Sequence, residues 1–466
     1  MKLRNLFLAA SAAALFFAAM TACCNNGEKT DNVIRTEVPE RPEGQLSALG
    51  MTADPIEKVH VGFIGLGMRG TGAIERYVYL EGAEITALCD LRPECVERSQ
   101  QIVLAHGLPA AAEYSGEDGW KELCEREDID LVYIATDWLH HTPMALYAME
   151  CGKHVAIEVP AAMTLQDCWD LINTSERTRK HCMMLENCVY DFFEMTALQM
   201  AREGMFGDVI HVEGSYAHNL DPYWDEYWNN WRLDYNHKNR GDVYATHGIG
   251  PVCQVLNMHR GDRMKTLVAM DTDAFNGPKH VEARTGEPCT DFQNGDETST
   301  MIRTEKGKTI LIEHDVMTPR PYSRMYQLVG TDGYAAKYPI GQVCLRSEGA
   351  EAVAYDNLQG EVVYYGAELD QLMEAHRNPV VTPELEALAR TVGGHGGMDF
   401  IMDYRLIYCL NHGLPLDMDV YDLAEWCCLA ELSRISIENG CAPVEVPDFT
   451  RGEWDKVNGF DYAFAK

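Results

Sequence analysis

Basic residues are scarce in this chain relative to acidic ones. Thirty-nine lysines and arginines stand against seventy-two aspartates and glutamates, which gives a formal net charge of -33 over 466 residues. Such a charge repels nucleic acid and anionic membrane surfaces and keeps a protein in solution. We therefore exclude nucleic acid and other polyanions as partners. The surplus of acid alone says nothing about the substrate.

Paired cysteine motifs are also missing. The sixteen cysteines are scattered, with no C-x-x-C pair and no histidines at a matching spacing. Several stand inside apolar runs, where a free thiol behaves as a small buried hydrophobe. These are Cys89, Cys151, Cys253 and Cys409. We expect most cysteines to be free, leave a few disulfides open, and predict no structural zinc site and no catalytic metal.

A glycine-rich turn is the strongest local signal that is present. The apolar strand KVHVGFI runs into G-x-G-x-x-G, and the next strand, EITALCD, ends in Asp90. In a dinucleotide site Gly65 makes the sharp turn, Gly67 leaves room for the pyrophosphate, and Gly70 lets the following helix pack on its strand. Asp90 would accept hydrogen bonds from a ribose diol, which favours NAD, although Arg92 could pair with a 2′-phosphate.

The order of elements predicts two domains. Strands and helices alternate over about 58–162, which is typical of a parallel sheet with helices on both faces, and we assign 56–177 to an NAD-binding Rossmann domain. Two hairpins follow, TSTMIRTEKGKTILIEHDV and RMYQLVGTDGYAAKY, so 178–466 should form an α+β domain with a largely antiparallel open sheet. We expect the helical segment from about 397 to 440 to pack back on the first domain.

The first residues resemble a bacterial lipoprotein signal. Lys2 and Arg4 precede an apolar run that ends before Met20-Thr21-Ala22-Cys23. The run is too short to span a bilayer comfortably, which favours export and cleavage. We therefore predict a signal peptide over 1–23, a lipid anchor on Cys23, a polar tether over 24–55, and a location in the cell envelope. The sequence leaves the number of subunits open, a homo-oligomer included.

The strand HVAIEV ends in Glu158-Val159-Pro160. An E-x-P sequence closing this strand, after a Rossmann pattern and before a mixed sheet, resembles the Gfo/Idh/MocA oxidoreductases over about 56–445. In the dehydrogenases of that family the strand ends in E-K-P, and the lysine assists removal of a proton from the alcohol. Valine cannot transfer a proton, so this chain lacks that residue.

Longer strings are similar to those of one branch of that group. They are GFIGLGMRG, WLHH, EVPAA, LENCVYDFFEMTALQMAREGMFGDVIHVEGSYAH, NRGDVYATHGIGPV and HGGMDF. Together they resemble the NAD-dependent glycoside hydrolases of family 109, which are α-N-acetylgalactosaminidases. The resemblance implies a substrate that is a glycan or glycoside with a terminal α-linked N-acetylgalactosamine.

The resemblance also implies two sets of binding residues. The cofactor would be bound by the glycine turn and by Met68, Arg69, Asp90, Trp138, Leu139, His140, His141, Glu158, Val159 and Asn187. The sugar would be bound by Tyr216, Arg232, Tyr244, Ala245, Thr246, His247 and Tyr326. The tryptophan-rich run around Arg232 suits stacking on the apolar face of a sugar.

The mechanism that the resemblance implies leaves the cofactor unchanged. Hydride leaves C3 of the sugar, a base removes the acidified C2 proton, the anomeric group is eliminated, water adds, and the hydride returns. Histidine suits acid/base work near neutral pH, so His247 is the leading candidate, with Tyr244 as its partner donor. Tyr190 is a second candidate for the C2 proton, and Glu158 could bind the ribose or take part in proton transfer.

Two other functions stay open at this stage. An NAD-dependent sugar oxidoreductase would fit the fold, but the missing E-K-P lysine speaks against it. A non-catalytic sugar-binding lipoprotein would fit the export signal, but the retained YATH and Asn187 speak against it. Free NAD is scarce outside the cytoplasm, which favours an enzyme that recycles a tightly bound cofactor.

Overall fold

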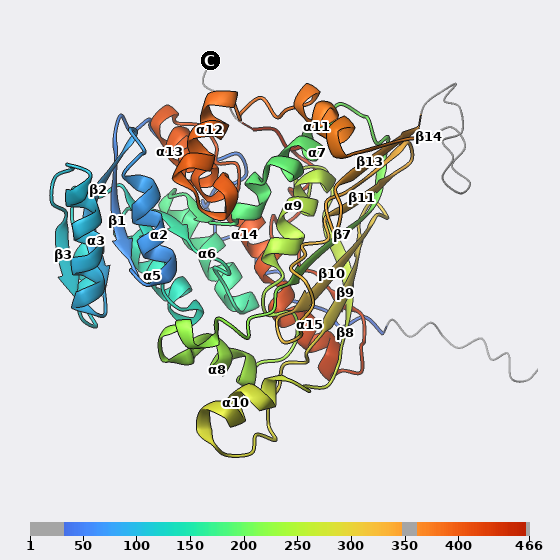
Figure 1. Ribbon diagram of the computed structural model, residues 1–466, viewed down its shortest axis with the longest axis horizontal. Helices are drawn as coiled ribbons and strands as arrows, with labels where there is room; N and C mark the ends of the chain where they lie inside the picture. The colour runs from blue at the N-terminus through green and yellow to red at the C-terminus, as the bar shows by residue number, and fades with distance from the viewer. Residues whose placement is uncertain (1–31, 347–360, 463–466) are drawn as a thin grey trace, which may run out of the picture. The chain divides into compact units, whose positions relative to one another are not determined.

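Strands and helices alternate through the first part of the chain, as the sequence pattern predicts. In the computed structural model, which describes residues 32–346 and 361–462, this part forms a six-stranded sheet of order β3-β2-β1-β4-β5-β6 with all neighbours parallel (Figure 1). Its strands are β1 (Val59–Ile64), β2 (Ala83–Asp90), β3 (Ala112–Ser115), β4 (Leu131–Ile134), β5 (His154–Ile157) and β6 (Cys182–Met184). The predicted Rossmann-type parallel sheet is confirmed, and its last strand lies beyond residue 177.

The helices of this part begin at recognisable caps. They are α2 (Met68–Tyr77), α3 (Pro93–Ala105), α4 (Gly119–Cys124), α5 (Trp138–Glu150) and α6 (Leu165–Thr178). Thr164 and Asp167 form a reciprocal capping box on α6. The Asp137 side chain accepts from the backbone N–H of Leu139, so α5 begins at Trp138.

The second sheet is largely antiparallel, as predicted. Its order is β14-β13-β12-β11-β7-β10-β9-β8-β15, and β7 and β10 are its one parallel pair within the described residues. The strands are β7 (Val209–Ala217), β8 (Met264–Asp271), β9 (Thr298–Thr304), β10 (Thr309–Asp315), β11 (Gln327–Gly330), β12 (Gly333–Ala336), β13 (Gln342–Arg346), β14 (Glu361–Tyr365) and β15 (Val444–Glu445). The pairs β9–β10 and β11–β12 confirm both predicted hairpins.

Helices from the second part of the chain contact both sheets. They are α7 (Phe192–Arg202), α8 (Trp231–Lys238), α9 (Thr246–Leu256), α10 (Gly277–Thr285), α11 (Gly366–Ala375), α12 (Pro383–Val392), α13 (Met398–His412), α14 (Val420–Cys427) and α15 (Leu429–Glu438). Helix α9 lies against β7, where a Cβ on Gly214 would come within 2.1 Å of the Gly248 carbonyl oxygen. Helix α13 contacts α2 and β1, and α14 contacts α6 and β6, so these two helices pack on the first domain as predicted (Figure 1). Helix α15, in the same predicted segment, packs instead on β8 and β15 of the second sheet.

Part of the segment predicted to be a tether is packed against the folded unit. Gln45 Nε2 donates to Glu176 at 2.7 Å, and Ser47 Oγ lies 2.9 Å from the Tyr421 hydroxyl. Ala48 and Met51 are buried. Residues 35–55 therefore differ from the expected free linker, because they offer both apolar side chains and hydrogen-bonding groups to the body. The predicted signal peptide lies outside the described residues.

The cysteines and the helices also bear on what the sequence predicts. The fourteen cysteines in the described part of the chain are all unpaired, which agrees with the expectation of mostly free thiols. Across the same residues, no helix combines the length and apolar character that crossing a membrane requires.

Candidate active site

The glycine turn between β1 and α2 has no space for a side chain at two of its glycines. Gly65 has a φ of +88°, and a Cβ there would lie 2.7 Å from the carbonyl carbon of Ala135. A Cβ on Gly70 would lie 1.8 Å from the carbonyl oxygen of Gly65. At Gly67 the nearest neighbour is an Arg92 nitrogen at 3.7 Å. Gly65 and Gly70 therefore close the turn, while Gly67 leaves open space through which a phosphate can approach.

A cavity of about 940 Å³ opens at the carboxyl ends of β1, β2 and β4. Its volume suits a bound cofactor, and its place in the sheet is where parallel α/β folds bind dinucleotides. Six residues of the predicted cofactor set line it: Gly65, Gly67, Met68, Arg69, Asp90 and His140. Aromatic side chains from the second part of the chain complete the wall: Tyr227, Trp228 and Trp231.

Asp90 is held in a fixed orientation at the end of β2. Its Oδ2 accepts from the backbone N–H of Leu66 at 2.6 Å, and its Oδ1 accepts from the backbone N–H of Arg92 at 2.8 Å. The Arg92 Nε also donates to Oδ1, at 3.3 Å. A carboxylate has about four acceptor positions, so one, on Oδ2, remains for a ribose diol. The Arg92 guanidinium lies 5.3 Å from the Trp228 ring centre, which places this cation over an aromatic wall of the cavity.

The WLHH residues form the first turn of α5, and they face different ways. His140 lines the cavity, and its Nδ1 lies 2.7 Å from Asp137 Oδ2. His141 is buried, with its ring nitrogens 2.8 Å from the Pro160 carbonyl and 3.0 Å from the Thr136 carbonyl, and burial lowers its pKa. Leu139 is 66% exposed. Of the four residues, His140 is the one that lines the cavity. His141 forms hydrogen bonds to the residues that follow β4 and β5.

An ion-pair network connects the cavity to α13. Arg69 Nη2 donates to Glu158 Oε1 at 2.8 Å, and its Nη1 lies 3.2 Å from Asp399 Oδ2. Asn187 Nδ2 donates to Asp399 Oδ1 at 2.5 Å. Burial opposes ionisation of Asp399, but Arg69 outweighs it and holds the pKa of this carboxyl well below its usual range. Val159 is buried beside Glu158. The network positions Glu158 and Asn187 through a carboxylate that sequence reasoning did not assign.

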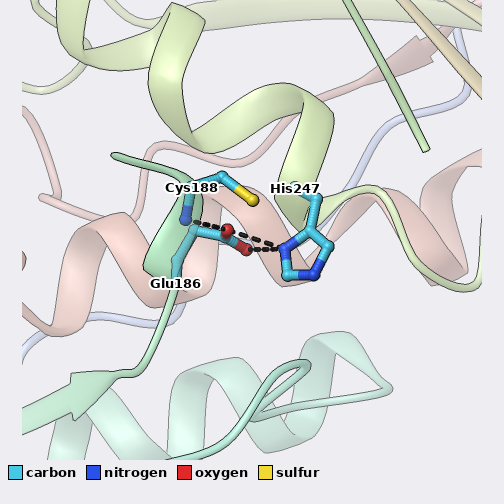
Figure 2. Close-up of side chains that lie close together, drawn as sticks. All are labelled: Glu186, Cys188 and His247. Carbon is cyan, nitrogen blue, oxygen red and sulfur yellow. Dashed lines mark hydrogen bonds and ion pairs between the residues drawn. The ribbon is translucent and has the colours of Figure 1, made fainter. Parts of the chain in front are cut away.

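His247 is paired with a buried carboxylate. Figure 2 shows its imidazole on α9 facing Glu186, which follows β6. His247 Nδ1 lies 2.7 and 2.9 Å from the two carboxylate oxygens, and Nε2 lies 3.3 Å from the Tyr244 hydroxyl. Burial acts to raise the pKa of Glu186, but His247 lowers it overall, so the carboxylate is ionised at neutral pH. One imidazole nitrogen is thus fixed, and the other is directed to a phenol.

Aromatic rings surround a buried guanidinium next to this pair. The Arg232 guanidinium carbon lies 4.6 Å from the Tyr244 ring centre and 5.1 Å from that of Trp138. The Tyr216 ring lies 4.6 Å from that of Tyr244 and 5.2 Å from the His247 imidazole. The structure therefore brings four predicted substrate residues together with Trp138 and Glu186 into one cluster, which we call the His247 cluster: Trp138, Glu186, Tyr216, Arg232, Tyr244 and His247.

The His247 cluster shares a wall with the cofactor cavity. Tyr227 lines the cavity, and its hydroxyl accepts from Arg232 Nη1 at 2.6 Å. Trp231 also lines the cavity and packs edge-on against Trp138, with ring centres 5.1 Å apart. The segment that closes the cavity is therefore the one that presents Arg232 to the cluster.

Two predicted site residues lie elsewhere. The Tyr190 hydroxyl donates to Asp417 at 3.2 Å in a buried network, and burial raises the pKa of this phenol well above its usual value. The Tyr326 hydroxyl donates to the Glu194 carbonyl oxygen at 3.1 Å, and its side chain is 1% exposed. Neither hydroxyl is directed to His247. Tyr190 was predicted from its closeness to Asn187 in the sequence and Tyr326 from the family resemblance, and packing directs both hydroxyls to other partners.

Tyr322 is an exposed tyrosine that lies near the His247 cluster. Its ring packs edge-on against His218, with centres 5.2 Å apart, and His218 Nδ1 lies 2.8 Å from the Tyr216 hydroxyl. The Tyr322 ring is 42% exposed, so it can contact a ligand.

Ala245 and Thr246 are buried at the start of α9 and contribute mainly to the placement of His247. Glu186 could have been found in the sequence, because it follows a strand of the parallel sheet.

One group of potential metal ligands lies within the cluster. Glu186, Cys188 and His247 bring a carboxylate, a thiol and an imidazole near one another (Figure 2). Both Glu186 oxygens are already within hydrogen-bond distance of His247, and burial raises the pKa of Cys188 well above its usual value. Because both carboxylate oxygens already face His247 Nδ1, a histidine–carboxylate pair accounts for this geometry.

Two family models together match most of the chain. Residues 59–186 match the oxidoreductase family with an NAD-binding Rossmann fold, and residues 190–456 match the C-terminal domain of glycosyl hydrolase 109. The glycosyl hydrolase family 109 protein 1 of Bacteroides thetaiotaomicron is 63% identical over 437 residues, which is 93% of each chain. A family 109 protein of Porphyromonas gingivalis is 63% identical over 440 residues, again 93% of each.

Solved structures share the fold at low identity. A levoglucosan dehydrogenase in complex with NADH and levoglucosan matches with a TM-score of 0.64 at 19% identity, over 84% of this chain and 99% of the other. A UDP-N-acetylglucosamine 3-dehydrogenase from Acidithiobacillus ferrooxidans matches with a TM-score of 0.55 at 15% identity, over 82% and 99%. The parallel sheet and its glycine turn are thus an NAD-binding Rossmann domain, and the glycine at position 67 fits that cofactor.

Proposed function

This chain belongs to glycosyl hydrolase family 109, and on that premise we propose that it releases terminal α-linked N-acetylgalactosamine from glycans by a redox-neutral, NAD-dependent reaction. The sugar is oxidised at C3, loses its C2 proton and its anomeric group, takes up water, and is reduced again. This route needs no pair of carboxylates flanking the scissile bond. It needs a retained cofactor and one well-placed acid/base group.

The shared wall between the cofactor cavity and the His247 cluster is the observation that supports this proposal most. Tyr227 and Trp231 line the cavity and also contact Arg232 and Trp138. A sugar bound at the cluster would therefore be adjacent to the cofactor. Arg232 is buried, always charged, and partly stacked on rings, so it can donate to a hydroxyl or acetamide oxygen of the sugar.

The residues of the cavity fit a cofactor that stays bound. When bound, NAD supplies reversible hydride acceptance for C3 of the sugar. Gly67 leaves room for the phosphates to approach, and Asp90 keeps one acceptor position for the ribose. Residues 224–231 bring Tyr227, Trp228 and Trp231 over the cavity, with Arg92 against the Trp228 ring. This aromatic strap would slow release of the dinucleotide.

Proton transfer is assigned to His247. Glu186 holds its Nδ1, which leaves Nε2 to exchange a proton with the sugar or with Tyr244. Burial raises the pKa of Tyr244 well above its usual value, so the phenol is neutral and acts as a hydrogen-bond donor. An ionised partner also stabilises the charge that the imidazole gains on taking a proton. Glu158 is engaged with Arg69 and Tyr133, and its role is to order the cavity.

The proposal is tested with an aryl α-N-acetylgalactosaminide and no added cofactor. Purified protein should release the aryl group over many turnovers, with no growth of absorbance from reduced nicotinamide. Denaturation should then release about one dinucleotide per chain. An aryl α-galactoside, which lacks the acetamide, should be a poorer substrate if Arg232 recognises that group.

Each other outcome identifies a different function. Stoichiometric reduction of the nicotinamide would make the protein a sugar oxidoreductase. Sugar binding without release or reduction would make it a binding lipoprotein. Turnover by protein that contains no dinucleotide would contradict the redox-neutral route.

We also propose export and lipid anchoring, on the strength of residues 1–23 alone. Lys2 and Arg4, the apolar run and Cys23 resemble a lipoprotein signal. When the protein is expressed in its natural host, it should fractionate with membranes, and Cys23→Ser should shift it to the soluble fraction. Identical fractionation of the two forms would remove the anchor from the account.

A further inference from the structure

Three side chains that are potential metal ligands meet at the C-terminal end of α8, outside the His247 cluster. His237 belongs to the last turn of the helix, while Cys289 and Asp291 follow α10. One ligand atom from each lies within 4.8 Å of the others. Fifty-two residues separate His237 from Cys289, so no short spacing motif reveals the group in the sequence.

The distances within this group approach those of a tetrahedral zinc site. Cys289 Sγ lies 3.6 Å from His237 Nε2 and 3.6 Å from Asp291 Oδ1, and the nitrogen lies 2.8 Å from that oxygen. Ordinary zinc bond lengths at tetrahedral angles give edges of about 3.5 Å to sulfur and about 3.3 Å between nitrogen and oxygen. Two edges already match, and the third requires a widening of about 0.5 Å on the side of an exposed aspartate.

We propose that His237, Cys289 and Asp291 bind a zinc ion, with water as the fourth ligand. Thiolate, imidazole and carboxylate are the three side-chain types that zinc takes, and this mixture favours zinc over calcium or magnesium, which prefer oxygen alone. The Cys289 side chain is almost fully buried, while Asp291 is 77% exposed in its side chain. The ion would enter from the aspartate side, where the water ligand would also lie.

The chain around the three ligands is ordered by contacts that need no metal. The backbone N–H of Gln293 donates to the His237 carbonyl at 3.0 Å, and that of Asn294 donates to the Asn236 carbonyl at 3.2 Å. The Phe292 ring stacks on the His237 imidazole, with centres 5.3 Å apart and planes 9° apart. Because the two segments are already docked, binding a metal requires little further ordering.

A zinc ion here would stabilise the helix that presents Arg232. His237 and Arg232 lie on the same helix, about 7.5 Å apart along its axis. The ion would join the end of α8 to the segment after α10 and so limit fraying of the helix. It would act as a structural clamp beside the sugar site. This proposal departs from the expectation of no structural zinc site, because that expectation rested on short spacing motifs and His237 lies 52 residues from Cys289 in the sequence.

The test uses the full chain, stripped of metal and kept reduced by a non-chelating phosphine. We expect equilibrium dialysis against zinc to give about one ion per chain. Titration with cobalt should produce a near-ultraviolet thiolate-to-cobalt charge-transfer band. Cys289→Ser should remove the band and the zinc, while Cys344→Ser, at a partly exposed free cysteine away from the three ligands, should keep both.

A second variant keeps the result clear if the serine substitution disturbs folding. Asp291→Asn changes an exposed side chain, so it should fold normally and bind zinc at least tenfold more weakly. A cobalt band that persists in Cys289→Ser would place the ligand thiol elsewhere, and no band in folded wild-type protein would mean that the three residues form only hydrogen bonds. Either result would overturn the proposal, and neither depends on glycosidase activity.

Discussion

The cofactor cavity and the His247 cluster are neighbours, but they are built differently. The cavity is formed around one turn and one strand end, so its key residues, Gly65 to Gly70 and Asp90, lie close together in the sequence. The cluster gathers Glu186, Arg232 and His247 from three separate segments, all of them largely buried. Local sequence thus specifies the cofactor site, while the cluster depends on how Glu186, which follows the first sheet, packs against helices from the second part of the chain.

The largest effect should come from removing the imidazole of the cluster. His247→Ala should lower aryl release by two or more orders of magnitude, as loss of a general acid/base does, and should leave the bound NAD in place because His247 does not line the cavity. Steady-state kinetics and dinucleotide content measure the two effects separately. His412→Ala, at an exposed histidine, is the control. Near-normal turnover in His247→Ala would remove this residue from the mechanism.

Glu186→Gln tests the carboxylate that sequence reasoning did not assign. The substitution keeps the side-chain shape but removes the charge that faces His247 Nδ1 at 2.7 Å. We expect kcat to fall about tenfold to a hundredfold, with little change in KM or NAD content. Glu186→Asp should recover part of the loss. If the glutamine variant instead loses bound NAD at unchanged kcat, Glu186 supports the cavity and not the cluster.

Two glycine substitutions separate ligand binding from packing in the cavity. Gly67→Ala meets nothing closer than 3.7 Å, so the protein should melt normally but bind NAD at least tenfold more weakly, because the methyl group blocks the pyrophosphate. Gly70→Ala would clash with the Gly65 carbonyl and should lower the melting temperature. Calorimetry and dinucleotide content provide the readouts. Equal effects of both substitutions on stability would contradict this division of roles.

The free energy of unfolding should depend on alkaline pH through a buried histidine near the cluster. His259 follows α9, the helix that includes His247, and its Nδ1 lies 2.8 Å from Glu425. Burial opposes its charge, but the surrounding carboxylates outweigh burial and raise the pKa of His259 to about 10. An unfolded histidine has a pKa of about 6.5, so the stabilisation is complete below that pH and is lost as pH rises toward 10.

His259→Gln should therefore flatten this dependence. We expect it to lower the free energy of unfolding near pH 7 by about 3 kcal/mol, because buried carboxylates lose their partner. Urea unfolding of both proteins between about pH 6.5 and 10 measures the difference, which should shrink toward the alkaline end. Parallel curves would show that the folded protein holds His259 neutral.

The sequence predicts more of the first region than of the second, for a physical reason. The parallel sheet, its glycine turn and both hairpins follow from periodicity and turn residues, which are local properties. The partner of His247 is 61 residues away, and the partner of Asn187 is 212 residues away, so neither is visible in spacing. The hydroxyls of Tyr190 and Tyr326 have partners that the sequence does not reveal either, since only packing decides which way a buried phenol points, and their roles at the site stay predictions.

Hydrolysis in deuterium oxide is the most direct test of the redox-neutral route. The account predicts released N-acetylgalactosamine with one carbon-bound deuterium at C2, because that proton is removed and replaced from solvent, and with the original hydrogen at C3, because the hydride returns. Mass spectrometry and proton NMR of the product distinguish the two positions. Product with no deuterium at C2 would show direct cleavage of the glycosidic bond and would contradict the account.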